Sequence, residues 1–243
     1  MENVKTPLPL KPVKFLDRLR AFIRLDGKSY ATENTYVYWV YQYILFHNKT
    51  HPAKMGSAHV EAYLSHLALV SNTAPNTQKT ALNAIMFLYN RFLKIPIEKL
   101  DFQYARKPKR TPTVFTHTEA LAVIDCLVMP YKLMAQLMYG SGLRISEALR
   151  LRVKDIDFSM GYLIIRDGKG GKDRTTLLPK SLIVDLKNQV IVVSALLAFD
   201  KARNLGPVYL PHALERKYPN AGRSLEWQFC FPRKILVTIL VQM

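Results

Sequence analysis

The stretch that decides the fold is YGSGLRISEAL, residues 139–149. Gly140 and Gly142 precede Arg144, after which the spacing of apolar residues is helical. A glycine turn that opens into a helix presents backbone N–H groups beside the guanidinium, and both favour a bound phosphate. Glu147 lies one turn further along the same helix, where its carboxylate can steady the arginine. An ordinary loop before a surface helix explains these residues equally well, so this stretch alone leaves both interpretations open.

A second basic cluster lies at the tip of a predicted hairpin. Residues 157–165 alternate like a strand, a Gly-Lys-Gly-Gly turn follows, and residues 175–178 return. Lys169 lies in this turn, with Lys172 and Arg174 beside it. A lysine there can contact a phosphate backbone as a charge or donate a proton to a leaving oxygen. The turn is not a nucleotide-binding P-loop, because the Gly-x-x-x-x-Gly-Lys-Ser/Thr spacing is missing.

The charge balance indicates a polyanionic partner. Lys and Arg total 35 against 18 Asp and Glu, which gives a net charge of +17. Neutralising phosphates with release of counterions is the most direct use of such an excess, although a ribosome-like or merely soluble basic protein shares it. The apolar fraction of 49% is that of an ordinary globular chain. Cys126 and Cys230 are too isolated for a disulfide framework or a zinc site, and we expect both to be small core residues.

Upstream of these clusters, the spacing of apolar residues predicts four amphipathic helices with short joints. Their apolar stripes lie within residues 13–23, 36–44, 60–67 and 82–92. Thr32 and Ser57 are the expected starts of the second and third helices. The aromatic stripe Tyr36, Trp39 and Tyr43 favours core packing over base stacking. We therefore expect a proline-rich leader over residues 1–12 and a helical domain over residues 13–103.

A basic, proline-punctuated segment at residues 104–113 predicts a linker. Its cations are Arg106, Lys107, Lys109 and Arg110. We interpret it as a strap along a phosphate backbone, with a solvated surface loop as the alternative. Residues 114–243 add further helices, the first capped by Thr116 or Thr118, to the hairpin. The fold class expected is mainly α with a small β-hairpin or sheet.

Clustered carboxylates, which a metal-dependent nuclease or transposase would need, are not evident. Asp155 and Asp157 lie beside a strand and are expected to be turn and surface acids. His47 and His51 lack further ligands, so we expect neither a metal nor a cofactor. No apolar run follows the charges of residues 1–5, so we expect no signal peptide, and the apolar residues 235–241 are too few to span a bilayer. We expect a cytoplasmic protein without membrane contact.

In order and spacing, the Arg144 stretch, LRVKDID (151–157) and GKGGKDR (168–174) closely resemble the front half of a tyrosine recombinase catalytic domain. LPHALERKYPNAG (210–222) resembles the inserted helix of integron integrases. The resemblance spans about residues 13–232. It implies an N-terminal SAM-like core-binding domain, the front part of a catalytic domain over residues 114–243, and the integron insertion near residues 207–222.

The resemblance also implies a chemistry. In such enzymes a tyrosine attacks the scissile phosphodiester and forms a 3′-phosphotyrosyl link without metal or nucleotide. By position, Arg144 is the first of two phosphate-holding arginines, Glu147 its acidic neighbour, and Lys169 the lysine that protonates the leaving 5′ oxygen. The implied partners are a double-stranded attachment site and a folded single-stranded cassette site, on which full-length relatives form tetramers. The insertion, with His212, Arg216 and Lys217, corresponds to the part that recognises extruded bases.

The second half of the family pattern is missing from these 243 residues. None of the six histidines has Arg three residues later, and none of Tyr162, Tyr209 and Tyr218 stands in the nucleophile's setting. Residues 233–243 change abruptly to a β-branched run. We interpret this as a reading-frame shift and early stop, with a naturally short variant as the alternative. We therefore expect a cassette-integrating recombinase by descent that binds DNA without cutting it. The alternative is a fragment that occupies recombination sites and interferes with a full-length enzyme.

Overall fold

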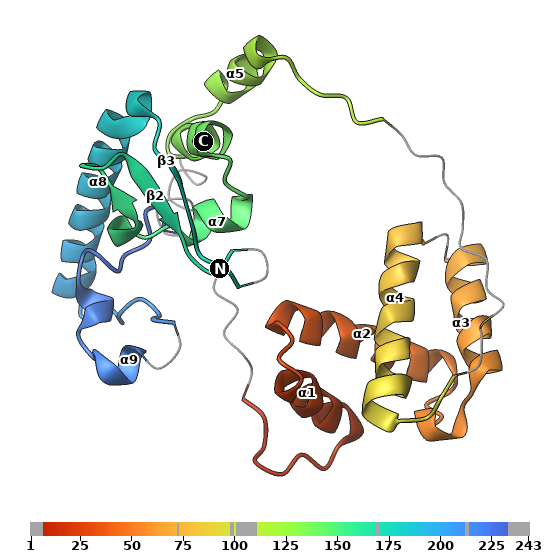
Figure 1. Cartoon of the computed structure of the whole chain (residues 1–243). Helices are drawn as coiled ribbons and strands as arrows, with labels where there is room; N and C mark the ends of the chain where they lie inside the picture. Colours follow the sequence, from red (N-terminus) through yellow and green to blue (C-terminus); the bar gives the residue numbers. More distant parts are fainter. Residues whose placement is uncertain are drawn as a thin grey trace. The chain divides into compact units, whose positions relative to one another are not determined.

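The computed structural model describes residues 7–71, 73–97, 100, 111–168, 171–211 and 214–232. The chain divides into two compact units that meet between Pro112 and Thr113. Each has its own hydrophobic core, and Figure 1 shows the helices and the small sheet. The expected fold class, mainly α with a small sheet, is confirmed. The basic residues of the predicted linker, Arg106, Lys107, Lys109 and Arg110, lie outside the described residues.

The N-terminal unit holds the four predicted helices. They are α1 (Phe15–Leu25), α2 (Tyr30–Phe46), α3 (Ser57–Leu69) and α4 (Pro75–Phe87), and a π-helical segment (Leu88–Leu93) continues α4. α2 packs against α1 and α4, and α3 packs against α4. α2 starts before the predicted Thr32, because the Ser29 hydroxyl caps it by accepting the Thr32 amide at 3.2 Å. The start of α3 at Ser57 is as predicted.

Tyrosines link the helices at the centre of this unit. The hydroxyls of Tyr43 and Tyr89 lie 3.1 Å apart, and Tyr89 donates to the Pro52 carbonyl at 3.0 Å. Both rings are fully buried, whereas Tyr36 and Trp39 pack at the margin of the core. The predicted aromatic stripe is therefore part of the core, and its innermost member, Tyr43, is hydrogen-bonded to the π-helical segment that continues α4.

The C-terminal unit combines helices with a three-stranded antiparallel sheet in the order β1-β2-β3. Its elements are α5 (His117–Asp125), α6 (Tyr131–Ser141), α7 (Ile145–Arg150), β1 (Ile156–Asp157), β2 (Tyr162–Ile165), β3 (Arg174–Leu177), α8 (Ile183–Ala202) and α9 (Leu214–Lys217). Thr116 caps α5, as one of the two predictions had it. Figure 1 shows α8 running beside the sheet, and Leu186 of α8 shares a core with Leu163 of β2.

Three sequence-based expectations are wrong in this unit. Residues 157–165 do not form one strand. Asp157 ends β1, residues 158–161 turn and Tyr162–Ile165 form β2, because Asp157 Oδ1 accepts the amides of Ser159 and Met160 at 2.9 and 2.8 Å. Asp155 is buried rather than a surface acid, and it accepts Arg166 Nε at 2.7 Å. Cys126 is exposed just after α5, whereas Cys230 is buried as expected.

One helical segment among the described residues, Lys180–Ala202, is long and apolar enough to cross a membrane by length and composition only. In this fold 22% of that window is buried, and Leu186 on its inner face packs in the core. Val184, Ile191 and Val192 of the same helix are exposed. A core helix of a soluble protein passes the same test, so the segment is weak evidence for a membrane span.

A buried carboxylate joins α1 to α2. The Glu33 side chain is 1% exposed, and it accepts Arg24 Nε at 2.7 Å and Arg20 Nη1 at 3.0 Å. Burial alone would raise the pKa of Glu33, but the hydrogen bonds from Arg24 and Arg20 outweigh it and hold that pKa below its ordinary value. Glu33 therefore stays ionised at neutral pH and links α2 to α1 through both arginines.

We expect Glu33→Gln to destabilise the N-terminal unit by about 3 kcal/mol, because losing one partner leaves the other charges of a buried cluster unbalanced. Urea unfolding followed by Trp39 fluorescence and helix circular dichroism measures the change. Arg91→Gln, which removes the exposed Arg91–Asp26 pair, is the matched control and should cost at most about 1 kcal/mol. An equal loss of unfolding free energy in the two variants would contradict a larger contribution from buried Glu33 than from the exposed ion pair.

Candidate phosphate-binding site

The glycine turn before Arg144 is shaped by close packing. Gly142 ends α6 with a left-handed φ of 64°, a conformation that glycine adopts without strain. A Cβ on Gly140 would lie 2.6 Å from Pro179 Cγ, so the end of α6 approaches this proline as only glycine allows. Thr176 of β3 donates its hydroxyl to the Ser141 carbonyl at 2.8 Å. The turn is therefore fixed to the sheet before Arg144 begins α7.

Glu147 connects the start of α7 with β3. Its carboxylate accepts the Arg144 backbone amide at 2.8 Å, Arg144 Nη1 at 2.9 Å and Arg174 Nη2 at 2.9 Å. Arg174 also donates to the Gly142 carbonyl at 3.2 Å. The Glu147 side chain is 5% exposed, whereas that of Arg144 is 56% exposed. One buried acid thus holds two arginines whose guanidinium groups remain accessible, as the sequence predicted for Arg144.

Burial alone would raise the pKa of Glu147, but the hydrogen bonds from the Arg144 backbone, the Arg144 side chain and Arg174 lower this pKa and outweigh the effect of burial. The net pKa lies below its ordinary value, so the acid is ionised at neutral pH. Two guanidinium charges and one carboxylate leave a net positive charge at this point. Such a cluster suits a phosphate oxygen, because charge-assisted hydrogen bonds from arginine are strong and can be bidentate.

The base of the predicted hairpin lies against the same acid. A Cβ on Gly168 would lie 2.9 Å from the Lys172 carbonyl and 3.6 Å from Glu147 Oε1. Lys172 is exposed in this turn, and its carbonyl accepts the Gly168 amide at 3.1 Å. Lys169 follows Gly168 directly but lies outside the described residues. The structure therefore brings Arg144, Glu147 and Arg174 together and places the start of the Lys169 turn beside them.

Two further arginines share the pocket of Arg144, and sequence reasoning missed both. The pocket has a volume of about 450 Å³ and is lined by Arg144, Ser146, Glu147, Arg150, Arg166, Asp167 and Gly168. Arg150 ends α7, and Arg166 follows β2 directly. The signal for Arg150 was its position in the same short helix as Arg144. Nothing in the sequence pattern pointed to Arg166, because its place depends on the Asp155 contact.

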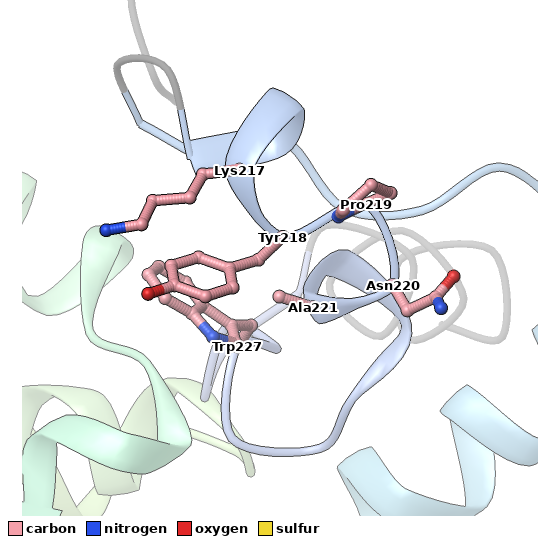
Figure 2. Close-up of a pocket in the computed structure, with 6 residues that line it drawn as sticks. All are labelled: Lys217, Tyr218, Pro219, Asn220, Ala221 and Trp227. Atoms are coloured by element: carbon pink, nitrogen blue, oxygen red, sulfur yellow. The ribbon is translucent and has the colours of Figure 1, made fainter.

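A second cluster involves the predicted insertion. A pocket of about 500 Å³ is lined by Lys217, Tyr218, Pro219, Asn220, Ala221 and Trp227. Figure 2 shows Tyr218 projecting from the end of α9 toward the region of Trp227, with the Asn220 amide pointing away from the tyrosine ring. Lys217 and Arg216 lie on α9, both exposed, while His212 lies outside the described residues. Trp227, which the sequence led us to expect in the core or between strands, is half-buried at this pocket.

Arg152 fastens this cluster to the rest of the unit. Its guanidinium donates to the Trp227 carbonyl at 2.7 Å and to the Tyr209 carbonyl at 3.0 Å, and it lies 4.3 Å from the Phe229 ring centroid. Lys154 Nζ lies 3.0 Å from the centroid of the Trp227 indole. Burial lowers the pKa of Lys154 from its ordinary value. The aromatic wall of the pocket therefore rests on two cations.

In the part of the chain that the structure describes, no group of three or more His, Cys, Asp or Glu side chains is placed to hold a metal ion. The chemistry that the arginine cluster itself can perform is the binding and polarisation of an anion. The pocket at Trp227 can hold a flat ring against an aromatic surface. These are two separate sites in one unit, one charged and one mostly apolar.

Comparison with known proteins assigns the class. Residues 15–99 match the phage integrase N-terminal SAM-like domain, and residues 109–243 match the phage integrase family. The chain belongs to the phage integrase family. The family match runs to residue 243 and so includes residues 233–243, which we expected to depart from the family pattern.

Relatives and solved structures agree with this assignment. The chain is 44% identical over 233 residues to an integrase/recombinase of Escherichia coli, covering 95% of this chain and 69% of that protein. It is 30% identical to tyrosine recombinase XerA of Pyrococcus furiosus, covering 71% of this chain and 59% of that protein. It shares its fold with the Tn1549 transposon integrase in complex with transposon right end DNA, at a TM-score of 0.52 and 14% identity. That match covers 73% of this chain and 65% of the integrase, less than two thirds of its length.

The pH dependence of stability should reveal the Glu147 cluster. Because its pKa is lowered on folding, ionised Glu147 stabilises the fold fully above its ordinary pKa of 4.5, and this contribution is lost as the pH falls through the lower folded value. The unfolding midpoint in urea should therefore be higher for the unaltered chain than for Glu147→Gln at pH 7. The difference between the two urea midpoints should become smaller below pH 4.5. Glu215→Gln, which changes an exposed acid of α9, should show no gap at either pH. A gap that persists unchanged in acid would contradict this account.

Proposed function

We propose that this chain binds DNA as the front part of an integron-type tyrosine recombinase and that these 243 residues alone do not cleave it. The observation that carries the proposal is the pair Arg144 and Arg174 held on buried Glu147, with the base of the Lys169 turn beside them. A scissile phosphate bound there would meet Arg144 as its first arginine. Lys169 would protonate the leaving oxygen, with Lys172 as a further contact to the DNA backbone.

Charge supports DNA as the partner. The net charge is +17, and acids such as Glu33, Glu147 and Asp155 are buried while their arginine partners stay partly exposed. The surface is therefore more basic than the composition alone implies. Arg106, Lys107, Lys109 and Arg110 would add a strap along the backbone between the two units. Relatives named as recombinases, and a shared fold with a DNA-bound transposon integrase, agree with this partner.

Strand cleavage needs groups that this sequence does not supply. The family chemistry uses a second arginine in a His-x-x-Arg motif, a further His or Trp and a tyrosine nucleophile, and the printed residues contain no His-x-x-Arg. Removing catalytic groups leaves binding while abolishing turnover. We propose that this chain can occupy recombination sites and interfere with a complete enzyme, which is the non-enzymatic alternative to a recombinase in its own right.

The purified chain should bind a labelled duplex with strong salt dependence and form no covalent adduct. Affinity should fall by roughly 10³-fold or more between about 50 and 200 mM salt if about six phosphates are contacted. Fluorescence anisotropy measures binding, and denaturing gels of a nicked suicide substrate test for the adduct. Arg144→Gln should weaken binding, whereas Arg18→Gln, which changes an exposed arginine of α1, is the control. A tyrosine-dependent adduct would contradict the proposed inactivity, and salt-independent binding would contradict the DNA partner.

The insertion gives the finer proposal, a folded single-stranded cassette site with extruded bases. An extruded base would stack at the pocket of Tyr218 and Trp227, with Arg216 and Lys217 of α9 available to its phosphates. The pocket has the size and the aromatic wall for one base. In this proposal a double-stranded attachment site uses the arginine cluster, and the folded site uses both clusters.

Tyr218→Ala should therefore weaken binding to a folded hairpin with an extruded base by roughly ten-fold, because one lost stack is worth about 1–3 kcal/mol. Affinity for the matched duplex without the extra base should not change. Tyr209→Ala is the control, because this exposed tyrosine lies in the same segment and contributes only its carbonyl to Arg152. Equal losses on both DNAs would show that the pocket does not distinguish them.

A further inference from the structure

The pocket beside Arg144 is lined by more arginines than one phosphate requires. Arg144, Arg150 and Arg166 all line it, together with the acids Glu147 and Asp167. Glu147 is already engaged by hydrogen bonds from Arg144 and Arg174. The Asp167 side chain is 80% exposed and lies 3.9 Å from Arg150, so it screens that arginine only loosely. The far end of the pocket is therefore positively charged.

Arg150 lines this pocket with one of its hydrogen-bond donors unpaired among the described residues. Its Nε is buried and has no hydrogen-bond partner among the described residues, while the side chain as a whole is 32% exposed. A guanidinium carries five donors, and in the described structure its only ion partner is Asp167. A buried unpaired donor is costly to keep, and such costs commonly mark functional positions. An incoming anion would bind the Nη groups at the exposed head of the side chain, where the Asp167 carboxylate is 3.9 Å from Nη1 and leaves that donor without a short hydrogen bond.

Arg166 faces the same space from β2 and is held more firmly. Its Nε donates to buried Asp155 at 2.7 Å, and its Nη1 lies 3.8 Å from Asp173. The side chain is 48% exposed, so one edge is anchored and the other is accessible. An arginine fixed at Nε presents its remaining N–H groups in a set direction, which lowers the entropy lost when a ligand binds.

We propose that Arg150 and Arg166 form a second phosphate subsite that takes the DNA phosphodiester next to the one on Arg144. Arg144 is the N-cap residue of α7 and Arg150 its last residue, about 9 Å apart along the axis by helix rise, which leaves room for a separate phosphate at each. Ser146 adds a hydroxyl on the wall between them. The subsite rests on the proposed function and deepens it. It fixes the register of the DNA strand at the arginine cluster.

Salt titration of duplex binding tests the subsite. In fluorescence anisotropy with a labelled duplex of arbitrary sequence, Arg150→Gln should make the slope of log affinity against log salt shallower by about 0.9, the value for one lost phosphate contact. Arg150→Lys should keep the slope and bind more weakly, because lysine retains the charge without the fork. Arg203→Gln is the control, since this exposed arginine lies over Phe199 after α8 and should leave the slope unchanged.

An Arg150→Gln slope equal to that of the unaltered chain would overturn the subsite while leaving DNA binding intact. Absence of salt-dependent binding by the unaltered chain would instead overturn the proposed function. A second measurement does not depend on a variant folding. Arg Nε–H resonances of the ¹⁵N-labelled unaltered chain are followed as inorganic phosphate is added. Shifts at both Arg144 and Arg150 are expected, and a shift at Arg144 alone would overturn the subsite.

Discussion

The C-terminal unit depends on one buried carboxylate. Glu147 receives a backbone amide and a guanidinium from Arg144 at the start of α7 and a guanidinium from Arg174 on β3. An ionised acid at 5% exposure is tolerable only when donors surround it, so these elements must meet at this point. Gly168 lies close enough to the same acid that the hairpin base is positioned with them. The acid therefore determines the geometry of the site before any ligand arrives.

The same arrangement recurs twice elsewhere in a chain of net charge +17. Glu33 holds Arg20 and Arg24 between α1 and α2, and Asp155 holds Arg166 after β2. In each case the acid is buried and the arginine remains partly exposed. Arg152 shows the opposite use, because it is buried itself and its guanidinium is used on the carbonyls of Tyr209 and Trp227. A buried arginine such as Arg152 therefore stabilises the fold, whereas the partly exposed arginines leave their charge at the surface.

The spacing of apolar residues was sufficient to predict α1 to α4, because each of these helices has its apolar residues at helical spacing. The pairing of Arg144 with Glu147 could also be predicted from the sequence, because a glycine turn, an arginine and an acid one helical turn later interact through local contacts. The failures came where distant residues decide. Asp155 is buried because Arg166 meets it, and Trp227 faces a pocket because Arg152 and Lys154 hold it across more than 70 residues of sequence. The turn at Asp157 was local, but its strand-like alternation concealed it.

The acid beneath Arg144 poses a physical trade-off. A carboxylate beside a phosphate site lowers the attraction for the phosphate, since it cancels one positive charge. It also removes the entropy that a free arginine would lose on binding, and it leaves the outer edge of each guanidinium open. For a phosphate bound in a half-dry pocket, orientation is worth more than one further screened charge, because a misplaced guanidinium cannot donate two parallel hydrogen bonds. The site keeps a net positive charge because more than one arginine surrounds the acid. Arg174 contributes its charge from β3, and its contact with Glu147 holds β3 beside the start of α7.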